Sequence, residues 1–392
     1  MAVTIQSILQ QHAGDYFARH RWPKRVLQAA QRMRDCRTAA LGGHVQRCPN
    51  GHVYRVHYNS CRHRSCPACG SLPGERWLAG WKERLLQTDH RHVVFALPDK
   101  LDVFWEYNRA VFSGLFFSSV RETLLELLGD KKYQGATPGM LAALHTWGQL
   151  LQTHLHLHVL VTAGGLDSQG QWRRAKKKCL LPRHVLMIVF RGKLRAKLRR
   201  AAERGELVLP PDWSLARFFS LLNKLGRVKW NVKILEPYEH GVGVATYLAR
   251  YVKGGPIKNE RLLALSDGQV TFRYRNNRNQ DPRTGRGRLE ITKMPVDEFL
   301  TRLWQHVPPE RMQTVRAWGL YASSTRDDLA AARRVLGQSP LAKVAQIRWQ
   351  DFLAKLGYPD RTRCPVCGAE LIVTDVFRRS RGPPADFREF AA

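Results

Sequence analysis

The sequence predicts a mixed protein of the α+β class, in which helices and strands surround a strand that carries histidines. Histidine alternates with aliphatic residues from Thr153 to Val161. Successive side chains of a strand point to opposite faces, so His154, His156 and His158 should share one face. The prediction also rests on helical periodicity, which occurs over residues 75–87, 104–128, 140–151, 182–206 and 213–226. Further strand patterns occur over residues 91–98 and 228–235.

The chain is strongly basic. Its 64 Lys and Arg residues outnumber 32 acidic residues, which gives a formal net charge of +32. A basic surface on this scale favours a polyanionic partner, most often nucleic acid. A hydrophobic content of 44% argues against global disorder. The sequence shows no signal-peptide pattern, and no apolar run approaches the roughly 18 residues of a membrane span, so we expect a cytoplasmic protein.

Residues that commonly bind metals crowd into the N-terminal part of the chain. The motif Cys66-Pro-Ala-Cys69-Gly is half of a zinc knuckle, because its two-residue gap lets both thiolates reach one tetrahedral ion. The motif Cys48-Pro-Asn-Gly-His52 is similar to a second half, with histidine in place of cysteine. We therefore predict at least one structural zinc, and the best individual site consists of Cys48, His52, Cys66 and Cys69.

Other cysteines remain outside this predicted site. Cys36 and Cys61, with His44 or His63, suggest a second adjacent zinc site, although Cys36 alone is as typical of a small buried hydrophobic residue. The lone motif Cys364-Pro-Val-Cys367-Gly either completes a zinc site with ligands elsewhere or forms a turn without metal. A cytosolic chain with eight cysteines favours metal binding over disulfides.

A second informative stretch spans residues 244–256, which reads as a helix ended by Gly-Gly-Pro. Tyr247 and Tyr251 are four residues apart and share one helix face, with Arg250 and Lys253 beside them. Such a pair is usually core packing. Together with a metal held by imidazoles it predicts other chemistry, since the metal can polarise a phosphate that a tyrosine hydroxyl attacks to form a covalent phosphotyrosine.

Two basic stretches are candidate DNA contacts. Arg173, Arg174 and Lys176 lie in the run RRAKKK, although a solvated charge run explains this pattern nearly as well. The predicted helix over residues 182–206 carries a row of arginines and lysines that we expect to face phosphates.

Several motifs together resemble one family: the rolling-circle transposases of bacterial insertion sequences, of the type called insertion sequence ninety-one. These are two-tyrosine members of the HUH endonuclease superfamily, where U is a hydrophobic residue. The motifs are DCRTAALGGH (35–44), NSCRHRSCPAC (59–69), HVVFALP (92–98), HLHLHVLVTAGG (154–165), YLARY (247–251) and HVPP (306–309). The likeness runs nearly end to end. One departure is Cys48-Pro-Asn-Gly-His52, where the family commonly has a second Cys-x-x-Cys-Gly.

The resemblance implies an HUH-type antiparallel sheet with helices on one face. It implies that His156 and His158 bind a catalytic Mg²⁺ or Mn²⁺, and that Tyr247 and Tyr251 are nucleophiles on single-stranded DNA. A third metal ligand is usual in such sites, and His154 is our candidate because it shares the strand face. The alternatives for this third ligand are Glu236, Glu239 and His240.

We therefore expect three domains: a zinc-binding module over residues 1–90, a catalytic domain over 91–310, and a mostly helical segment over 311–392 with a flexible tail. The predicted function is a bacterial, nucleoid-associated DNA transposase that cuts and rejoins single strands through a 5′-phosphotyrosine. A host helicase would separate strands, because the sequence has no phosphate-binding loop motif. The alternatives are a plasmid relaxase or replication initiator of the same superfamily, and a non-catalytic zinc-dependent nucleic-acid-binding protein.

Overall fold

The computed structural model describes residues 2–378 except 177–179, 239–242, 244–245 and 247–254. The chain divides into two compact units, each built from separate segments. Unit 1 comprises Met1–Arg76, Lys253–Val307 and Ala345–Ala392, and unit 2 comprises Trp77–Val252 and Pro308–Val344. Among the described helices, none combines the length and the apolar character that crossing a membrane requires.

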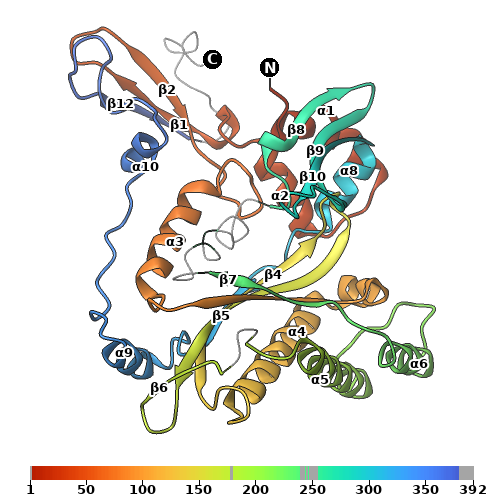
Figure 1. The fold of residues 1–392 in the computed structure, drawn as a ribbon. Helices are drawn as coiled ribbons and strands as arrows, with labels where there is room; N and C mark the ends of the chain where they lie inside the picture. The colour runs from red at the N-terminus through yellow and green to blue at the C-terminus, as the bar shows by residue number, and fades with distance from the viewer. Residues whose placement is uncertain (1, 177–179, 239–242, 244–245, 247–254, 379–392) are drawn as a thin grey trace. The chain divides into compact units, whose positions relative to one another are not determined.

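Unit 2 is organised around an antiparallel sheet with the strand order β11-β4-β5-β3-β7, and β6 pairs with β5 (Figure 1). The strands are β3 (His90–Ala96), β4 (Thr137–Trp147), β5 (Thr153–Leu166), β6 (Trp172–Arg174), β7 (Val232–Tyr238) and β11 (Val315–Gly319). The histidine-bearing strand β5 is therefore central, between β4 and β3. This mixed architecture confirms the predicted α+β class.

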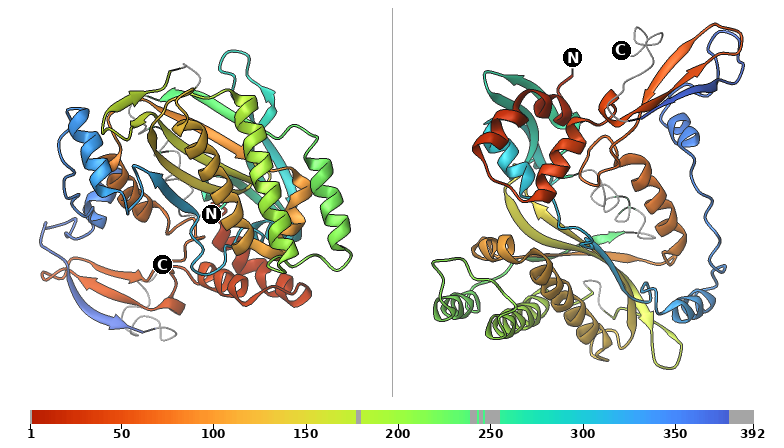
Figure 2. Two further views of the ribbon diagram at one scale, coloured as in Figure 1. Left: turned by 90° about the horizontal axis from the view of Figure 1, so that it is seen from below. Right: turned by 180° about the vertical axis from the view of Figure 1, so that it is seen from behind.

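One face of this sheet is covered by three helices: α4 (Asp102–Gly129), α5 (Arg183–Glu203) and α6 (Leu215–Leu225). Seen from below, they lie side by side across the strands (Figure 2, left). Leu155, Leu157 and Val159 of β5 point into this core and are at most 1% exposed. The period-two pattern of β5 thus places its aliphatic residues under the helices and its histidines on the opposite face.

The opposite face of the sheet has a smaller core beyond the histidines. Leu141 of β4 and Leu160 of β5 pack there with Tyr321 and with residues of α3 (Ser71–Arg84) and α9 (Arg326–Val335). The buried Tyr321 hydroxyl bonds His90 Nε2 at 2.7 Å and accepts the Leu86 amide at 3.0 Å. These contacts hold in place the end of this face where His90 lies. The histidines of β5 lie toward its other end.

Unit 1 contains two three-stranded antiparallel sheets, with the orders β12-β1-β2 and β10-β9-β8. Their strands are β1 (Gly43–Arg47), β2 (Tyr54–Tyr58), β8 (Leu262–Ser266), β9 (Gln269–Gln280), β10 (Gly287–Pro295) and β12 (Ile372–Phe377). The helices are α1 (Ile5–Arg19), α2 (Lys24–Arg34), α8 (Val296–Trp304) and α10 (Trp349–Lys355). Short 3-10 turns occur at Ala39–Leu41, Asp99–Leu101 and Asn259–Arg261.

Contacts between distant segments hold the helices of unit 1 in place. The N-terminal helix α1 starts at a capping box formed by Thr4 and Ser7. Its Tyr16 hydroxyl lies 2.9 Å from the Thr301 hydroxyl of α8, and Arg19 pairs with Asp297 at 2.5 Å. Residues near the N-terminus therefore pack against a helix almost 300 positions later in the chain.

Two predicted helices are wrong in whole or in part. Residues 140–151 are not helical, because Thr137–Trp147 forms β4 between β11 and β5. The methionine, leucines and alanines of this stretch favour a helix locally, but pairing on both edges in a buried sheet overrides that preference. The sequence pattern of residues 340–356 also predicts a helix, but in this stretch only α10 is helical, and the residues before it have no regular structure.

Gly319 offers a direct test of how β11 and β4 approach each other. It has a φ of +56°, and a Cβ there would collide with the Pro138 carbonyl oxygen. We expect Gly319→Ala to lower the free energy of unfolding of unit 2 by about 2–4 kcal/mol. Gly170, at φ +73° with open space around it, is the matched control and should lose only about 1 kcal/mol as alanine. Urea denaturation followed by circular dichroism compares the two, and equal losses would contradict the close approach.

Candidate active site and zinc sites

Three histidines from two neighbouring strands gather on the sheet face opposite α4 and α5. They are His145 of β4 and His156 and His158 of β5. Each offers a ring nitrogen, and these nitrogens all lie within 4.8 Å of one another. His145 pairs directly across the strands with His156, and its ring centroid lies 4.3 Å from that of His158. The three imidazoles can converge on one metal ion.

Hydrogen bonds orient two of these imidazoles for metal binding. The Nδ1 atom of His156 lies 2.8 Å from the backbone carbonyl of His154, which can only accept, so Nδ1 carries the proton and Nε2 keeps its lone pair. The Nδ1 atom of His158 lies 2.7 Å from Nε2 of His92 on β3. If His158 donates in this bond, its Nε2 also keeps a lone pair that could bind a metal. Such outer contacts commonly fix the orientation of metal-binding histidines.

Burial keeps these histidines neutral. Desolvation lowers the pKa of His156 to about 4 and that of His92 to about 4. Burial also lowers the pKa values of His145 and His158 well below the usual range. At neutral pH the rings therefore carry no proton on the coordinating nitrogen, which is the form that binds a cation.

The structure places His154 apart from this group. Its ring lies beside His156, at 4.9 Å between centroids, but its Nδ1 faces Asp99 at 4.0 Å and its side chain is 38% exposed. His145, which the sequence analysis did not single out, joins His156 and His158 instead. We missed it because residues 140–151 were predicted to be helical, although Pro138-Gly139 and Gly148 bound an apolar run in the way typical of a buried strand.

The first cysteine group contains four thiols: Cys36, Cys61, Cys66 and Cys69. The Sγ atom of Cys69 lies 3.5 Å from that of Cys36 and 3.7 Å from that of Cys61, and Cys66 lies 3.9 Å from Cys36. Tetrahedral zinc with Zn–S bonds of 2.3 Å requires S–S separations of about 3.8 Å. These thiols match that requirement.

The second group joins the two ends of the chain. It consists of Cys48 and His52 with Cys364 and Cys367. Cys48 Sγ lies 3.5 Å from Cys367 Sγ and 3.6 Å from His52 Nδ1. Both knuckles turn tightly through a glycine of positive φ, Gly51 at 76° and Gly368 at 72°. The C-terminal knuckle therefore completes a possible site with the N-terminal one.

The best zinc site predicted from the sequence, Cys48 and His52 with Cys66 and Cys69, is wrong, because its two halves belong to different groups. The spacing of its residues shows that each half can bind zinc. It does not show which other half lies beside it in the folded chain. His44 is in neither group and stacks on His57 at 5.2 Å. His63 is also in neither group, and its Nδ1 accepts the Ser65 amide at 3.2 Å. All seven described cysteines are free thiols.

The predicted DNA-contacting residues have mixed outcomes. Arg173 pairs with Asp167 at 2.6 Å, and Lys176 Nζ donates to the Lys131 carbonyl at 2.6 Å. Arg174 is exposed on β6. Tyr247, Arg250, Tyr251 and Lys253 lie outside the described residues, as do Glu239, His240 and the Glu236 side chain.

The basic row predicted on helix 182–206 contacts protein groups. Lys193 and Lys197 pair with Glu126 and Glu122 of α4, at 2.6 and 2.9 Å. Arg191 and Arg195 donate to the carbonyls of Val228 and Leu222, and Arg199 stacks over Phe219. These five residues therefore help to fix α5 between its neighbours, and the ridge that faces phosphates stays a prediction.

An antiparallel sheet that presents paired histidines, in a chain with cysteine groups spaced for zinc, is the arrangement expected of a DNA transposase with a zinc-binding domain. Comparison with known proteins agrees. A family model described as "Putative transposase" matches residues 139–328, and one described as "Transposase zinc-binding domain" matches residues 8–97. The chain is 34% identical over 394 residues to "Putative transposase y4qJ" of Sinorhizobium fredii, covering 97% of each chain.

A second relative is the transposase for insertion sequence element IS801 of Pseudomonas savastanoi pv. phaseolicola. It is 27% identical over 356 residues, covering 89% of this chain and 83% of the relative. The metal-bound conjugative relaxase TrwC in complex with oriT DNA covers 64% of this chain, with 14% identity and a TM-score of 0.25, which is too low to support an argument. This chain belongs to the rolling-circle transposases of the insertion sequence ninety-one type.

Family membership decides among the functions predicted from the sequence. The protein is a DNA endonuclease and strand transferase with a zinc-binding domain, and DNA is its substrate. The alternatives of a plasmid relaxase or replication initiator, and of a non-catalytic zinc-dependent nucleic-acid-binding protein, are not favoured.

Proposed function

We propose that the histidine group on β4 and β5 is the catalytic metal site of this transposase, and that its substrate is single-stranded DNA. The observation that carries the proposal is the convergence of His145, His156 and His158, with ring nitrogens within 4.8 Å, on the sheet face that the α4–α6 layer leaves uncovered. In His156 and His158 the Nδ1 atom lies within hydrogen-bonding distance of another protein group, the His154 carbonyl and the His92 ring respectively.

The site suits a divalent cation. Three neutral imidazoles are nitrogen ligands, which favour Mn²⁺, the transition metal, over Mg²⁺. When bound, the ion would polarise a scissile phosphate and offset the negative charge that develops during its cleavage. The chain's own contribution is to hold His145, His156 and His158 at fixed positions. His92 of the neighbouring strand β3, which is 5% exposed, supports His158 through the bond between their rings.

Tyr247 and Tyr251 are the proposed nucleophiles. A tyrosine hydroxyl loses its proton as its oxygen attacks phosphorus, the bond from phosphorus to the 3′ oxygen breaks, and the released 3′ oxygen takes up a proton to become a hydroxyl. The 5′ phosphate stays on the tyrosine as a phosphodiester, so a second hydroxyl can later displace it without an external energy source. Two tyrosines allow two such linkages in one site, as strand transfer requires.

The remaining assignments follow the predicted domains. Residues 1–90 bind structural Zn²⁺ at two sites. One site consists of Cys36, Cys61, Cys66 and Cys69, and the other consists of Cys48 and His52 together with Cys364 and Cys367 from residues 311–392. Residues 91–310 form the catalytic domain that cleaves DNA. Arg174, Arg250 and Lys253 contact the DNA backbone. The protein acts at the bacterial nucleoid in the cytoplasm, with a host helicase to separate strands.

A covalent adduct assay tests the proposed nucleophiles. A labelled single strand containing an element end is incubated with the protein and Mn²⁺, and the adduct is separated under denaturing conditions. We expect adduct with the wild type and none above background, a loss of at least about 10³-fold, with the Tyr247→Phe/Tyr251→Phe double variant. Each single variant should retain one route to the adduct.

The matched control is Tyr274→Phe, since Tyr274 lies on β9 and bonds Glu290 at 2.7 Å. It should form the adduct at the wild-type level. An adduct that persists in the double variant would show that neither tyrosine is the nucleophile.

A further inference from the structure

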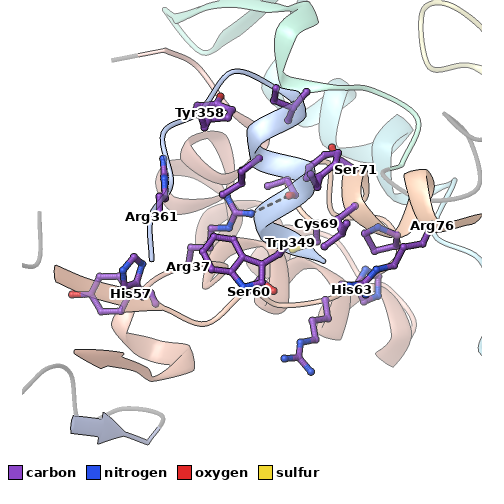
Figure 3. Close-up of a pocket in the computed structure, with 18 of the residues that line it drawn as sticks. Arg37, His57, Ser60, His63, Cys69, Ser71, Arg76, Trp349, Tyr358 and Arg361 are labelled. Carbon is purple, nitrogen blue, oxygen red and sulfur yellow. Dashed lines mark hydrogen bonds between the residues drawn. The ribbon is translucent and has the colours of Figure 1, made fainter. Parts of the chain in front are cut away.

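A pocket of about 1130 Å³ lies within unit 1, outside the histidine site and against the first cysteine group, whose Cys69 is among its lining residues. Its lining comes from two stretches of the chain, residues 37–76 and 349–361. The first stretch contributes β2 and the loops around the first cysteine group. The second contributes α10 and the segment that follows it (Figure 3).

The pocket is cationic. Arg37, Arg62, Arg76 and Arg361 line it, and none of the described lining residues is acidic. All four arginines are exposed. Figure 3 shows Arg361 toward one end of the pocket, Arg76 toward the other and Arg37 between them. Such a row of guanidinium groups fits an extended polyanion better than a single small anion.

The first cysteine group fixes two of these arginines. Arg37 directly follows Cys36 and has a φ of +57°, and Arg62 directly follows Cys61 and has a φ of +52°. This left-handed region is unfavourable for residues with a side chain and persists only where surrounding contacts impose it. Both positions lie next to a thiol of the same group, and both arginines line the pocket.

The opposite wall is aromatic and exposed. Trp349 and Tyr358 line the pocket and are 40% and 50% exposed, and the Arg361 guanidinium lies 5.7 Å from the centre of the Tyr358 ring. This wall is held in place, because Lys355 of α10 pairs with Glu75 at 2.8 Å and Arg76 Nε donates to the Ile347 carbonyl at 2.8 Å. Its exposed rings are available for stacking.

We propose that this pocket binds a single-stranded stretch of the DNA substrate, with phosphates on the arginines and unpaired bases stacked on Trp349 and Tyr358. Alternating cationic and aromatic side chains are the usual means of holding single strands, since every base has a face to stack. Duplex DNA is a poor fit, because its bases are already stacked on one another. The inference rests on the proposed single-stranded substrate and adds a contact region in unit 1 to the histidine group of unit 2.

Fluorescence anisotropy with a labelled single strand of mixed sequence tests the pocket in the Tyr247→Phe/Tyr251→Phe background, so that binding is measured without cleavage. We expect Arg37→Ala/Arg361→Ala to weaken binding at least tenfold. We also expect this variant to reduce the slope of log Kd against log salt by about 1.4, which corresponds to two lost phosphate contacts. The control removes equal charge from exposed residues outside the pocket, as Arg21→Ala/Arg278→Ala, and should change binding less than threefold.

The aromatic wall has its own test, which does not depend on charge. Trp349→Ala should weaken binding of the same strand about 5- to 100-fold, and Trp349→Phe should restore most of it. Binding of a blunt duplex of the same sequence should be unaffected by either variant. Zinc content and thermal unfolding confirm that each variant is folded.

Pocket variants that bind the single strand as tightly as the control pair would overturn the inference, as would an equal loss of duplex binding. The proposed function is tested separately by the adduct assay on protein that keeps both tyrosines, and it fails if this protein forms no adduct. If adduct forms and the pocket variants bind normally, only the pocket is wrong. If the pocket variants lose binding and the wild type forms no adduct, only the cleavage chemistry is wrong.

Discussion

Replacing His145 by alanine is expected to reduce strand cleavage about 10³-fold, as strongly as replacing His158. Both rings offer a nitrogen to the same position, and a metal bound by two imidazoles in place of three would be held weakly and at the wrong angle. A loss of about 4 kcal/mol of transition-state stabilisation corresponds to this factor. Single-turnover cleavage of a labelled strand measures it, with Mn²⁺ titrated in each variant.

His154→Ala is the matched control, because this histidine shares the strand face but lies outside the group of three. It should keep cleavage within about tenfold of the wild type. His145→Gln, which nearly preserves volume, separates lost coordination from a cavity, and both His145 variants should need higher Mn²⁺ concentrations. If His154→Ala is as damaging as His145→Ala, or if His145→Ala cleaves normally, the third ligand is misassigned.

The second large effect concerns zinc. We expect the purified protein to contain two zinc ions per chain, and Cys66→Ser and Cys364→Ser each to contain one. Structural zinc contributes roughly 10–16 kcal/mol in zinc-finger peptides, as much as the whole stability of a typical domain. Cys66→Ser should therefore unfold the region around Cys36 and Cys61, seen as rapid proteolysis within residues 36–69 at a temperature where the wild type resists.

Atomic emission spectroscopy on gel-filtered protein gives the zinc content. The double variant Cys66→Ser/Cys364→Ser should contain none, whereas His44→Ala should keep both ions, because His44 stacks on His57 and belongs to neither group. One zinc in the wild type, or two in Cys364→Ser, would contradict the pairing of Cys48 and His52 with the C-terminal knuckle.

The features that the sequence predicted correctly are local. The alternation from Thr153 to Val161 is enough to orient β5, because neighbouring side chains of a strand must point to opposite faces. Helices α4, α5 and α6 follow in the same way from apolar residues at helical spacing. The helix α1 was missed, although Thr4 and Ser7 form a recognisable capping box at its start.

The features that the sequence did not reveal depend on distant contacts. Cys48 and Cys367 are 319 residues apart, and their meeting follows from β12 pairing with β1, which no local pattern specifies. His145 becomes a ligand only because β4 pairs with β5 in the register that sets it opposite His156. The charged residues of α5 were likewise interpreted as a DNA surface, because sequence does not show that Glu122 and Glu126 lie beside Lys197 and Lys193.

The most direct test of the central claim is to map the protein–DNA adduct by mass spectrometry after digestion to peptides. With Mn²⁺ present, the peptide containing residues 247–251 should carry a nucleotide phosphate on Tyr247 or Tyr251. The modification should be absent without the metal and reduced to background in His145→Ala. A phosphate on any other residue, or the same modified peptide from His145→Ala at the wild-type level, would contradict the claim that three histidines and a tyrosine pair form one cleavage site.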